Sequence, residues 1–128
     1  MVRRSTGATQ QRFQALDMLA TLVSVVDDDG RLLFANNALE DAIGLSRRSL
    51  LGVPLTDWFT APELLQNALQ GSHGHEYAVI RYDAFLKRLN NEPLPVHVVV
   101  AKSDAPGEVV VEMLPLEQQT RQEREERL

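Results

Sequence analysis

Three histidines are the residues of this chain whose type is best suited to metal binding or proton transfer. His73 and His75 have an H-x-H spacing, and strand alternation would place both imidazoles on one side, where they could hold a metal ion. This spacing is a weak signal, and the sequence supplies no third ligand, so we interpret both as solvated loop histidines. His97 alternates with valines and is interpreted as an outward-facing strand residue.

The aspartate run at residues 27–29 could indicate a cation site. A β-turn explains the run more simply, because Gly30 follows it and apolar runs flank it. His75 with Glu76 is the nearest match to a phospho-accepting histidine, but the pair lies at a predicted strand start rather than on an amphipathic helix. The chain also has no P-loop, nucleophile elbow or dinucleotide fingerprint. We therefore predict no catalytic residue and no metal site, and we expect this chain not to be an enzyme.

Three larger side chains are candidates for lining a pocket between a sheet and its helices: Trp58, Arg81 and Tyr82. The alternative is that these side chains belong to the core and its rim. The chain contains no cysteine, which excludes disulfides, thiolate nucleophiles and thiolate metal ligands. We predict no bound cofactor.

Composition limits the kind of protein and its partners. The 128 residues are 44% hydrophobic and 24% charged, which is typical of one globular domain with one core. A net charge of −5 disfavours a nucleic-acid partner, because phosphate binding needs a basic surface. No apolar run approaches the roughly 20 residues that span a bilayer, and the N-terminus lacks the apolar region of a secretory signal. We therefore expect a cytoplasmic protein with no membrane partner.

The N-terminal part is divided by its apolar pattern into two segments. The polar residues 1–11 predict a flexible lead-in. Two apolar rows at helical spacing predict a helix over residues 12–21, with an apolar stripe wider than one packing surface requires. A second copy of the chain would cover this stripe, so we predict a homodimer through Phe13, Leu16, Leu19 and Ala20. The alternative is that the helix packs on its own sheet.

Five strands and three helical segments are predicted for the remainder. Alternating patterns predict strands over residues 22–26, 31–35, 76–86, 94–101 and 108–113. Helical patterns predict segments over residues 37–43, 55–59 and 63–70, the last ended by Gly71. The helix predicted at residues 37–43 would be capped by Asn36, or by Asn37 with Glu40 in a capping box, and ended by Gly44.

The polar residues 115–128 predict the start of a linker helix. The fold class is α+β: a five-stranded antiparallel sheet with short helices on one face and flanking terminal helices.

An ordered set of motif residues resembles a PAS domain. The set consists of the D-x-x-G-R turn at residues 27–31 and the pattern N-x-A-x5-G-x-S-x3-L-x-G at residues 36–52. The resemblance covers nearly the whole chain, and we place the PAS domain at residues 12–114. The segment 107–116 is similar to the sensor domain of nitrogen-regulation histidine kinases of the NtrB type. Many PAS domains have Asp-Ile-Thr where this chain has Met113-Leu114-Pro115, and that departure favours the NtrB group.

The resemblance implies a sensory and dimerisation module that modulates an attached kinase. In the NtrB family the intact protein phosphorylates itself on histidine and passes the phosphate to a response regulator, while a PII-type protein controls the balance of kinase and phosphatase activity. It also implies no flavin or haem, because flavin-linked PAS photoreceptors use a cysteine and haem PAS sensors commonly use a histidine on the helix at residues 63–70. The alternatives are a PAS sensor that binds a small molecule and a small α+β enzyme. The sequence argues against the enzyme, since no acid–base residues converge on the predicted inner face.

Overall fold

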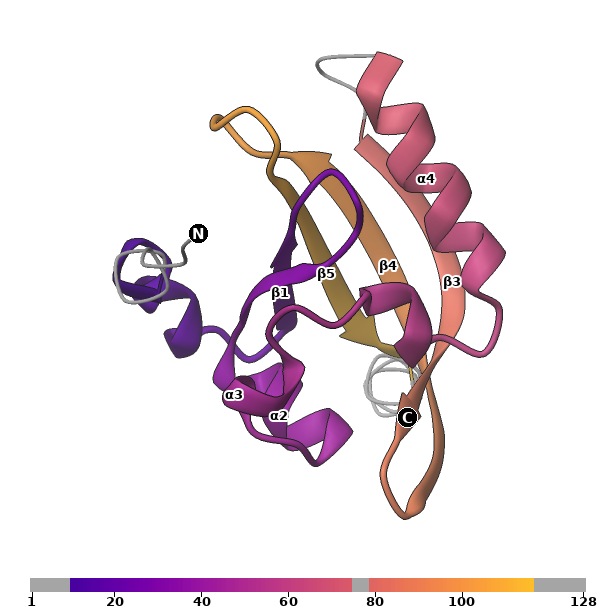
Figure 1. Ribbon diagram of the computed structural model, residues 1–128. Coiled ribbons are helices and arrows are strands. Elements are labelled where there is room, and N and C mark those ends of the chain that lie inside the picture. Colours follow the sequence, from indigo (N-terminus) through magenta and orange to yellow (C-terminus); the bar gives the residue numbers. More distant parts are fainter. Residues whose placement is uncertain (1–9, 75–78, 117–128) are drawn as a thin grey trace, which may run out of the picture.

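The computed structural model describes residues 10–74 and 79–116 as one sheet, with all helical elements except the N-terminal one on one of its faces (Figure 1). All strand pairs are antiparallel, and the five strands have the order β2-β1-β5-β4-β3. The strands are β1 (Leu22–Val26), β2 (Leu32–Ala35), β3 (Val79–Arg88), β4 (Asn91–Lys102) and β5 (Val109–Pro115). The helical elements are η1 (Gln14–Met18), α2 (Asn37–Ile43), α3 (Arg47–Leu50), η2 (Leu55–Trp58) and α4 (Pro62–Gly74). The predicted α+β fold with a five-stranded antiparallel sheet is confirmed.

The turn between β1 and β2 is set by one carboxylate and one glycine. The Asp27 carboxylate accepts hydrogen bonds from the backbone N–H of Asp29 at 2.9 Å and of Arg31 at 3.0 Å. Gly30 has a φ of 81°, a left-handed conformation that glycine adopts without strain. The predicted β-turn is therefore confirmed.

Helix α2 begins at a side-chain cap and ends at a glycine. The Asn36 side chain accepts a hydrogen bond from the backbone N–H of Leu39 at 3.0 Å, and Gly44 at the other end has a φ of 93°. The alternative capping box of Asn37 with Glu40 is wrong. The Glu40 carboxylate instead accepts a hydrogen bond from the backbone N–H of Arg47, because the chain folds back on itself after Gly44.

Helix α4 is longer than its sequence pattern predicted. Gly71 does not end the helix, which continues to Gly74, so His73 lies in a helix rather than in a loop. A Cβ at position 71 would lie 3.3 Å from Cδ1 of Ile80, so this glycine allows the helix to pack closely on β3. His75 lies outside the described residues, as does the start of the strand predicted at residue 76.

The hairpin between β3 and β4 is tighter than predicted. The strands predicted to end at residue 86 and to begin at residue 94 continue through the polar residues between them and turn at Leu89 and Asn90. Asn90 adopts a φ of 58°, which asparagine tolerates better than most residues. Two long strands are therefore joined without a loop.

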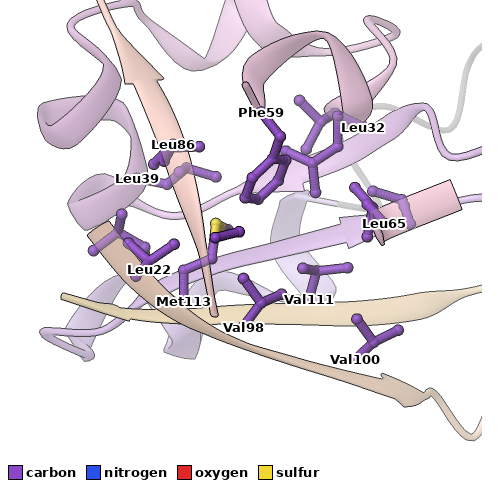
Figure 2. Packing of buried hydrophobic residues seen from close by; sticks show 14 of the residues in the cluster. Leu22, Leu32, Leu39, Phe59, Leu65, Leu86, Val98, Val100, Val111 and Met113 are labelled. Atoms are coloured by element: carbon purple, nitrogen blue, oxygen red, sulfur yellow. The ribbon is translucent and has the colours of Figure 1, made fainter. Parts of the chain in front are cut away.

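The core lies between the inner face of the sheet and the helices (Figure 2). On β4, Val96, Val98 and Val100 are fully buried, and the residues between them are not. Phe59, which follows η2, is 2% exposed and its backbone pairs with Leu86 of β3. The core side chains labelled in Figure 2 are Leu22, Leu32, Leu39, Phe59, Leu65, Leu86, Val98, Val100, Val111 and Met113.

The helix predicted over residues 12–21 is not formed as one element. The segment contains a short helical stretch ending at Arg12, then η1, and the chain is already extended at Leu19. The side-chain amide of Asn36 donates hydrogen bonds to the carbonyl oxygens of Leu16 and Thr21, which lie on either side of the extended residue Leu19. Residues 1–9 of the predicted lead-in and residues 117–128 of the predicted linker helix lie outside the described residues.

Candidate functional site

The outer face of the sheet, opposite the helices, carries a second group of buried apolar side chains. Val25 pairs with Phe34 across β1 and β2, and both are fully buried although neither belongs to the main core. Val23 lies on the same face and is 3% exposed. The ring of Phe13 lies over this group, 5.5 Å from the ring of Phe34 between centroids. We call Val23, Val25 and Phe34 the outer apolar patch, and residues 10–19, which cover it, the N-terminal strap.

Asn36 is the hub that joins the N-terminal strap to the sheet. Its side-chain oxygen accepts hydrogen bonds from the backbone N–H of Val23 and of Leu39, both at 3.0 Å. Its side-chain amide donates to the carbonyl of Leu16 at 2.9 Å and to that of Thr21 at 3.0 Å. The residue is completely buried, so these four bonds satisfy both ends of the amide away from water.

Arg47 forms a second attachment between the N-terminal strap and the domain. Its guanidinium lies 2.6 Å from the Asp17 carboxylate and donates a hydrogen bond to the Gln10 side chain at 3.1 Å. It also lies 4.7 Å from the centroid of the Phe34 ring and 3.7 Å from the Glu40 carboxylate. The planar guanidinium of arginine can stack on an aromatic ring while its N–H groups bond a carboxylate, which the compact ammonium group of lysine does less well.

Two polar contacts attach the strap and the residues after it to β5 and its preceding turn. Arg12 donates two hydrogen bonds to the Glu108 carboxylate, at 2.9 and 3.1 Å. This bonding, together with the negative charge of Glu108, raises the pKa of Arg12. The Thr21 hydroxyl donates to the Glu112 carboxylate at 2.8 Å. The strap is therefore held on both sides of the outer apolar patch.

The three predicted pocket residues do not all lie on one face of the sheet. Trp58 and Tyr82 pack against the main core from η2 and β3. Within the described part of the chain, neither the indole N–H of Trp58 nor the hydroxyl of Tyr82 has a hydrogen-bond partner, although both atoms are buried. Burial also raises the pKa of the Tyr82 hydroxyl, which is therefore neutral. Arg81 lies on the opposite face of β3 and is exposed, because adjacent residues of a strand point to opposite faces.

Residues with catalytic potential are scattered. The Nδ1–H of His97 donates a hydrogen bond at 2.8 Å to the Asp83 carboxylate on the neighbouring strand, at the outer face, as expected for an outward-facing strand residue. Among residues 10–74 and 79–116, no three His, Cys, Asp or Glu side chains cluster as metal ligands would. None of the helices in those ranges is both long and apolar enough to span a bilayer.

The four residues predicted for the dimer interface are divided by the structure. Phe13 and Leu16 are partly buried against their own domain. Leu19 is 46% exposed, Ala20 is also exposed, and the neighbouring Met18 is 88% exposed. The continuous apolar stripe expected from the sequence is therefore absent, and only its C-terminal end remains open.

A family comparison identifies the fold. The family model described as "PAS domain" matches residues 19–114. The chain belongs to the PAS domain family. The matched residues include the whole sheet except the last residue of β5, and all helical elements from α2 to α4, so the PAS domain accounts for the main core. A search of curated proteins gave no match.

Solved PAS domains resemble the chain in fold at low sequence identity. The PAS domain of an HTR-like protein from Haloarcula marismortui has a TM-score of 0.71 at 17% identity, covering 85% of this chain and 98% of that one. A domain of the sensory box sensor histidine kinase/response regulator from Geobacter sulfurreducens has a TM-score of 0.64 at 17% identity, covering 82% and 92%. The PAS domain of nitrogen regulation protein NR(II) from Vibrio parahaemolyticus has a TM-score of 0.62 at 21% identity, covering 81% and 96%.

The PAS motif includes Asn36 but not Arg47, so it predicts only part of the site. Asn36 is the asparagine of the motif, and its place at a helix start predicted its capping bond to Leu39. Its bonds to Leu16 of the N-terminal strap and to Thr21 could not be predicted, because they join residues up to 20 positions apart and reach a segment expected to be helical. Arg47 gave no sequence signal, since an arginine after a glycine-ended helix is usually a solvated residue.

Proposed function

We propose that this chain is the sensory and dimerisation PAS module of a cytoplasmic nitrogen-regulation sensor histidine kinase of the NtrB type. In this proposal the module modulates the kinase and phosphatase activity of attached domains toward a response regulator, under control of a PII-type protein. The observation that carries the proposal is the end of the sheet, where β5 finishes with Met113-Leu114-Pro115 instead of Asp-Ile-Thr. The likeness in fold to the NR(II) PAS domain is consistent with it.

The isolated chain should have no kinase activity. Phosphoryl transfer needs a phosphate-binding loop and a positioned acceptor, and the sequence has neither. Incubation with labelled ATP and magnesium should leave the chain unlabelled, whereas the parent protein should label on histidine. Removal of residues 1–114 from the parent should change the ratio of its kinase to phosphatase activity. Acid-labile phosphate on the isolated chain, or a parent protein whose activities are unchanged by the deletion, would contradict the proposal.

We further propose that the module forms a homodimer, with Leu19 and Ala20 in the interface. These residues and Met18 are apolar, consecutive and exposed just before β1. A second copy related by two-fold symmetry would cover them, as symmetric pairing commonly does for such surfaces. Phe13 and Leu16 would then support the interface from behind, because they already contact their own domain.

A lysine at position 19 should convert the dimer into a monomer. Leu19→Lys places a charge in the proposed interface but leaves the main core untouched, so the domain should stay folded. Light scattering should give dimer mass for the unmodified chain and monomer mass for the variant. The matched control is Leu64→Lys, because Leu64 is 42% exposed on α4, far along the chain from the interface, and this variant should remain dimeric. An unmodified chain that is monomeric at high micromolar concentration would refute the dimer.

The second candidate function is a PAS sensor that binds a small molecule. It is favoured by the two buried donors without a partner, Trp58 Nε1 and the Tyr82 hydroxyl, since a ligand with hydrogen-bond acceptors would satisfy them. Native mass spectrometry of the purified chain distinguishes the two functions. A bound small molecule that is lost in Tyr82→Phe would favour the ligand sensor.

A further inference from the structure

We propose that the N-terminal strap is a releasable cover, which Arg47 latches over the outer apolar patch and which opens while the rest of the domain stays folded. Opening converts the patch of Val23, Val25 and Phe34 from a buried surface into an accessible one. This inference goes beyond the proposed kinase role and does not depend on it, because the opening is a property of the isolated chain.

The first observation is an asymmetry in burial between the strap and what it covers. No residue of η1 is buried, and Met18 and Leu19 at the end of the strap are exposed. The patch beneath is buried almost completely, with Val25 and Phe34 at 0% exposure. A segment that buries little of its own apolar surface opens more readily than the elements of the core.

The second observation is that the attachment of the strap is mainly polar. Asp17, Gln10 and Arg12 bind the domain through side-chain hydrogen bonds and ion pairs at partly or fully exposed positions. Water can replace these contacts when the strap leaves. Opening must also break one hydrogen bond from the buried Asn36 side-chain amide to the carbonyl oxygen of Leu16. The apolar contacts of the strap come from Phe13, whose ring lies on Phe34, and from Leu16, and both side chains are only partly buried.

The third observation is that one side chain connects several of these contacts. Arg47 binds Asp17 and Gln10 of the strap and lies over Phe34 of the patch. It is also held from the domain side by Glu40. Loss of this guanidinium therefore removes its contacts with Asp17, Gln10 and Phe34 together and weakens the attachment of the strap, whereas β1 below keeps its pairing with both β2 and β5.

The test uses the absence of cysteine from the chain. Val25→Cys places a thiol beneath the strap, and Val98→Cys places a matched thiol in the main core, both at positions with 0% exposure. The reaction of each thiol with a soluble thiol reagent is followed at increasing urea concentration. We expect the thiol at position 25 to react at least about tenfold faster than that at position 98, with a much weaker dependence on urea, because local opening exposes less surface than global unfolding.

The role of Arg47 as the latch of the strap is tested in the chain that carries Val25→Cys. Arg47→Gln should accelerate labelling about tenfold, and added salt should accelerate it in the chain that keeps Arg47, because screening weakens the pair with Asp17. Arg48→Gln is the matched control, since Arg48 is the exposed neighbour, and should leave the rate unchanged. Equal rates and equal urea dependence at positions 25 and 98 would overturn the releasable strap. Equal effects of the two arginine variants would overturn Arg47 as its latch.

A measurement without substitutions covers the case in which a cysteine variant fails to fold. The backbone N–H of Asn37 donates to the Asp17 carboxylate of the strap at 2.9 Å. Its hydrogen exchange should be nearly independent of low urea concentrations, whereas that of core strand amides such as Val98 should increase steeply with urea. Exchange of the Asn37 amide with the steep dependence of the core would count against the proposal.

Discussion

Replacing Asn36 by alanine should destabilise the domain by about 3–5 kcal/mol, because the substitution leaves several buried backbone groups without partners. The N–H groups of Val23 and Leu39 and the carbonyls of Leu16 and Thr21 would lose their bonds to the side chain. The loss of the helix cap accounts for about 1 kcal/mol of this effect, and the unpaired groups account for the remainder. Urea unfolding followed by circular dichroism should show a lower midpoint.

Asn37→Ala is the matched control for this substitution. Asn37 is the same residue type one position along the chain, but it is exposed, and among the described residues its side chain makes a single 3.3 Å contact, with Arg47. We expect its free energy of unfolding to change by no more than about 0.5 kcal/mol. If the two variants were equally stable, Asn36 could not be the hub that joins the N-terminal strap to the sheet.

Replacing Phe59 by alanine should cost about 3–5 kcal/mol, the range for removing a buried aromatic side chain from a packed core. Phe59 is 2% exposed and fills the space between η2 and the strands (Figure 2). Its backbone also pairs with Leu86, so the ring fixes the segment that leads into α4 against the edge of the sheet. Thermal and urea unfolding should both shift to milder conditions.

Phe85→Ala tests whether the destabilisation expected for Phe59→Ala comes from the loss of a buried side chain or from the loss of any aromatic ring. Phe85 lies next to the same junction, since its carbonyl accepts a hydrogen bond from the backbone N–H of Thr60, but its side chain is 54% exposed on the outer face. We expect a change of no more than about 1 kcal/mol for this variant. A loss of stability as large as that of Phe59→Ala would mean that the outer face of β3 is covered, for example by a second copy of the chain.

The sequence by itself determined the elements whose cause is local. Asp27 and Gly30 specify their turn through their own backbone bonds and conformational freedom, and Asn36 and Gly44 specify the ends of α2. Period-two alternation likewise identified β3, β4 and β5, because one face of each strand is buried and the other is not. These features made the α+β fold and the PAS family predictable.

Only the tertiary structure decided what happens to the N-terminal segment and to the candidate site. Apolar residues at helical spacing favoured a helix over residues 12–21, but Asn36 binds two of its carbonyls and β1 extends the chain after them. The continuation of α4 past Gly71 also became visible only in the structure, where this glycine lies close to Ile80 of β3. Local propensities are small, so contacts between residues distant in sequence override them wherever backbone groups must be satisfied in the interior.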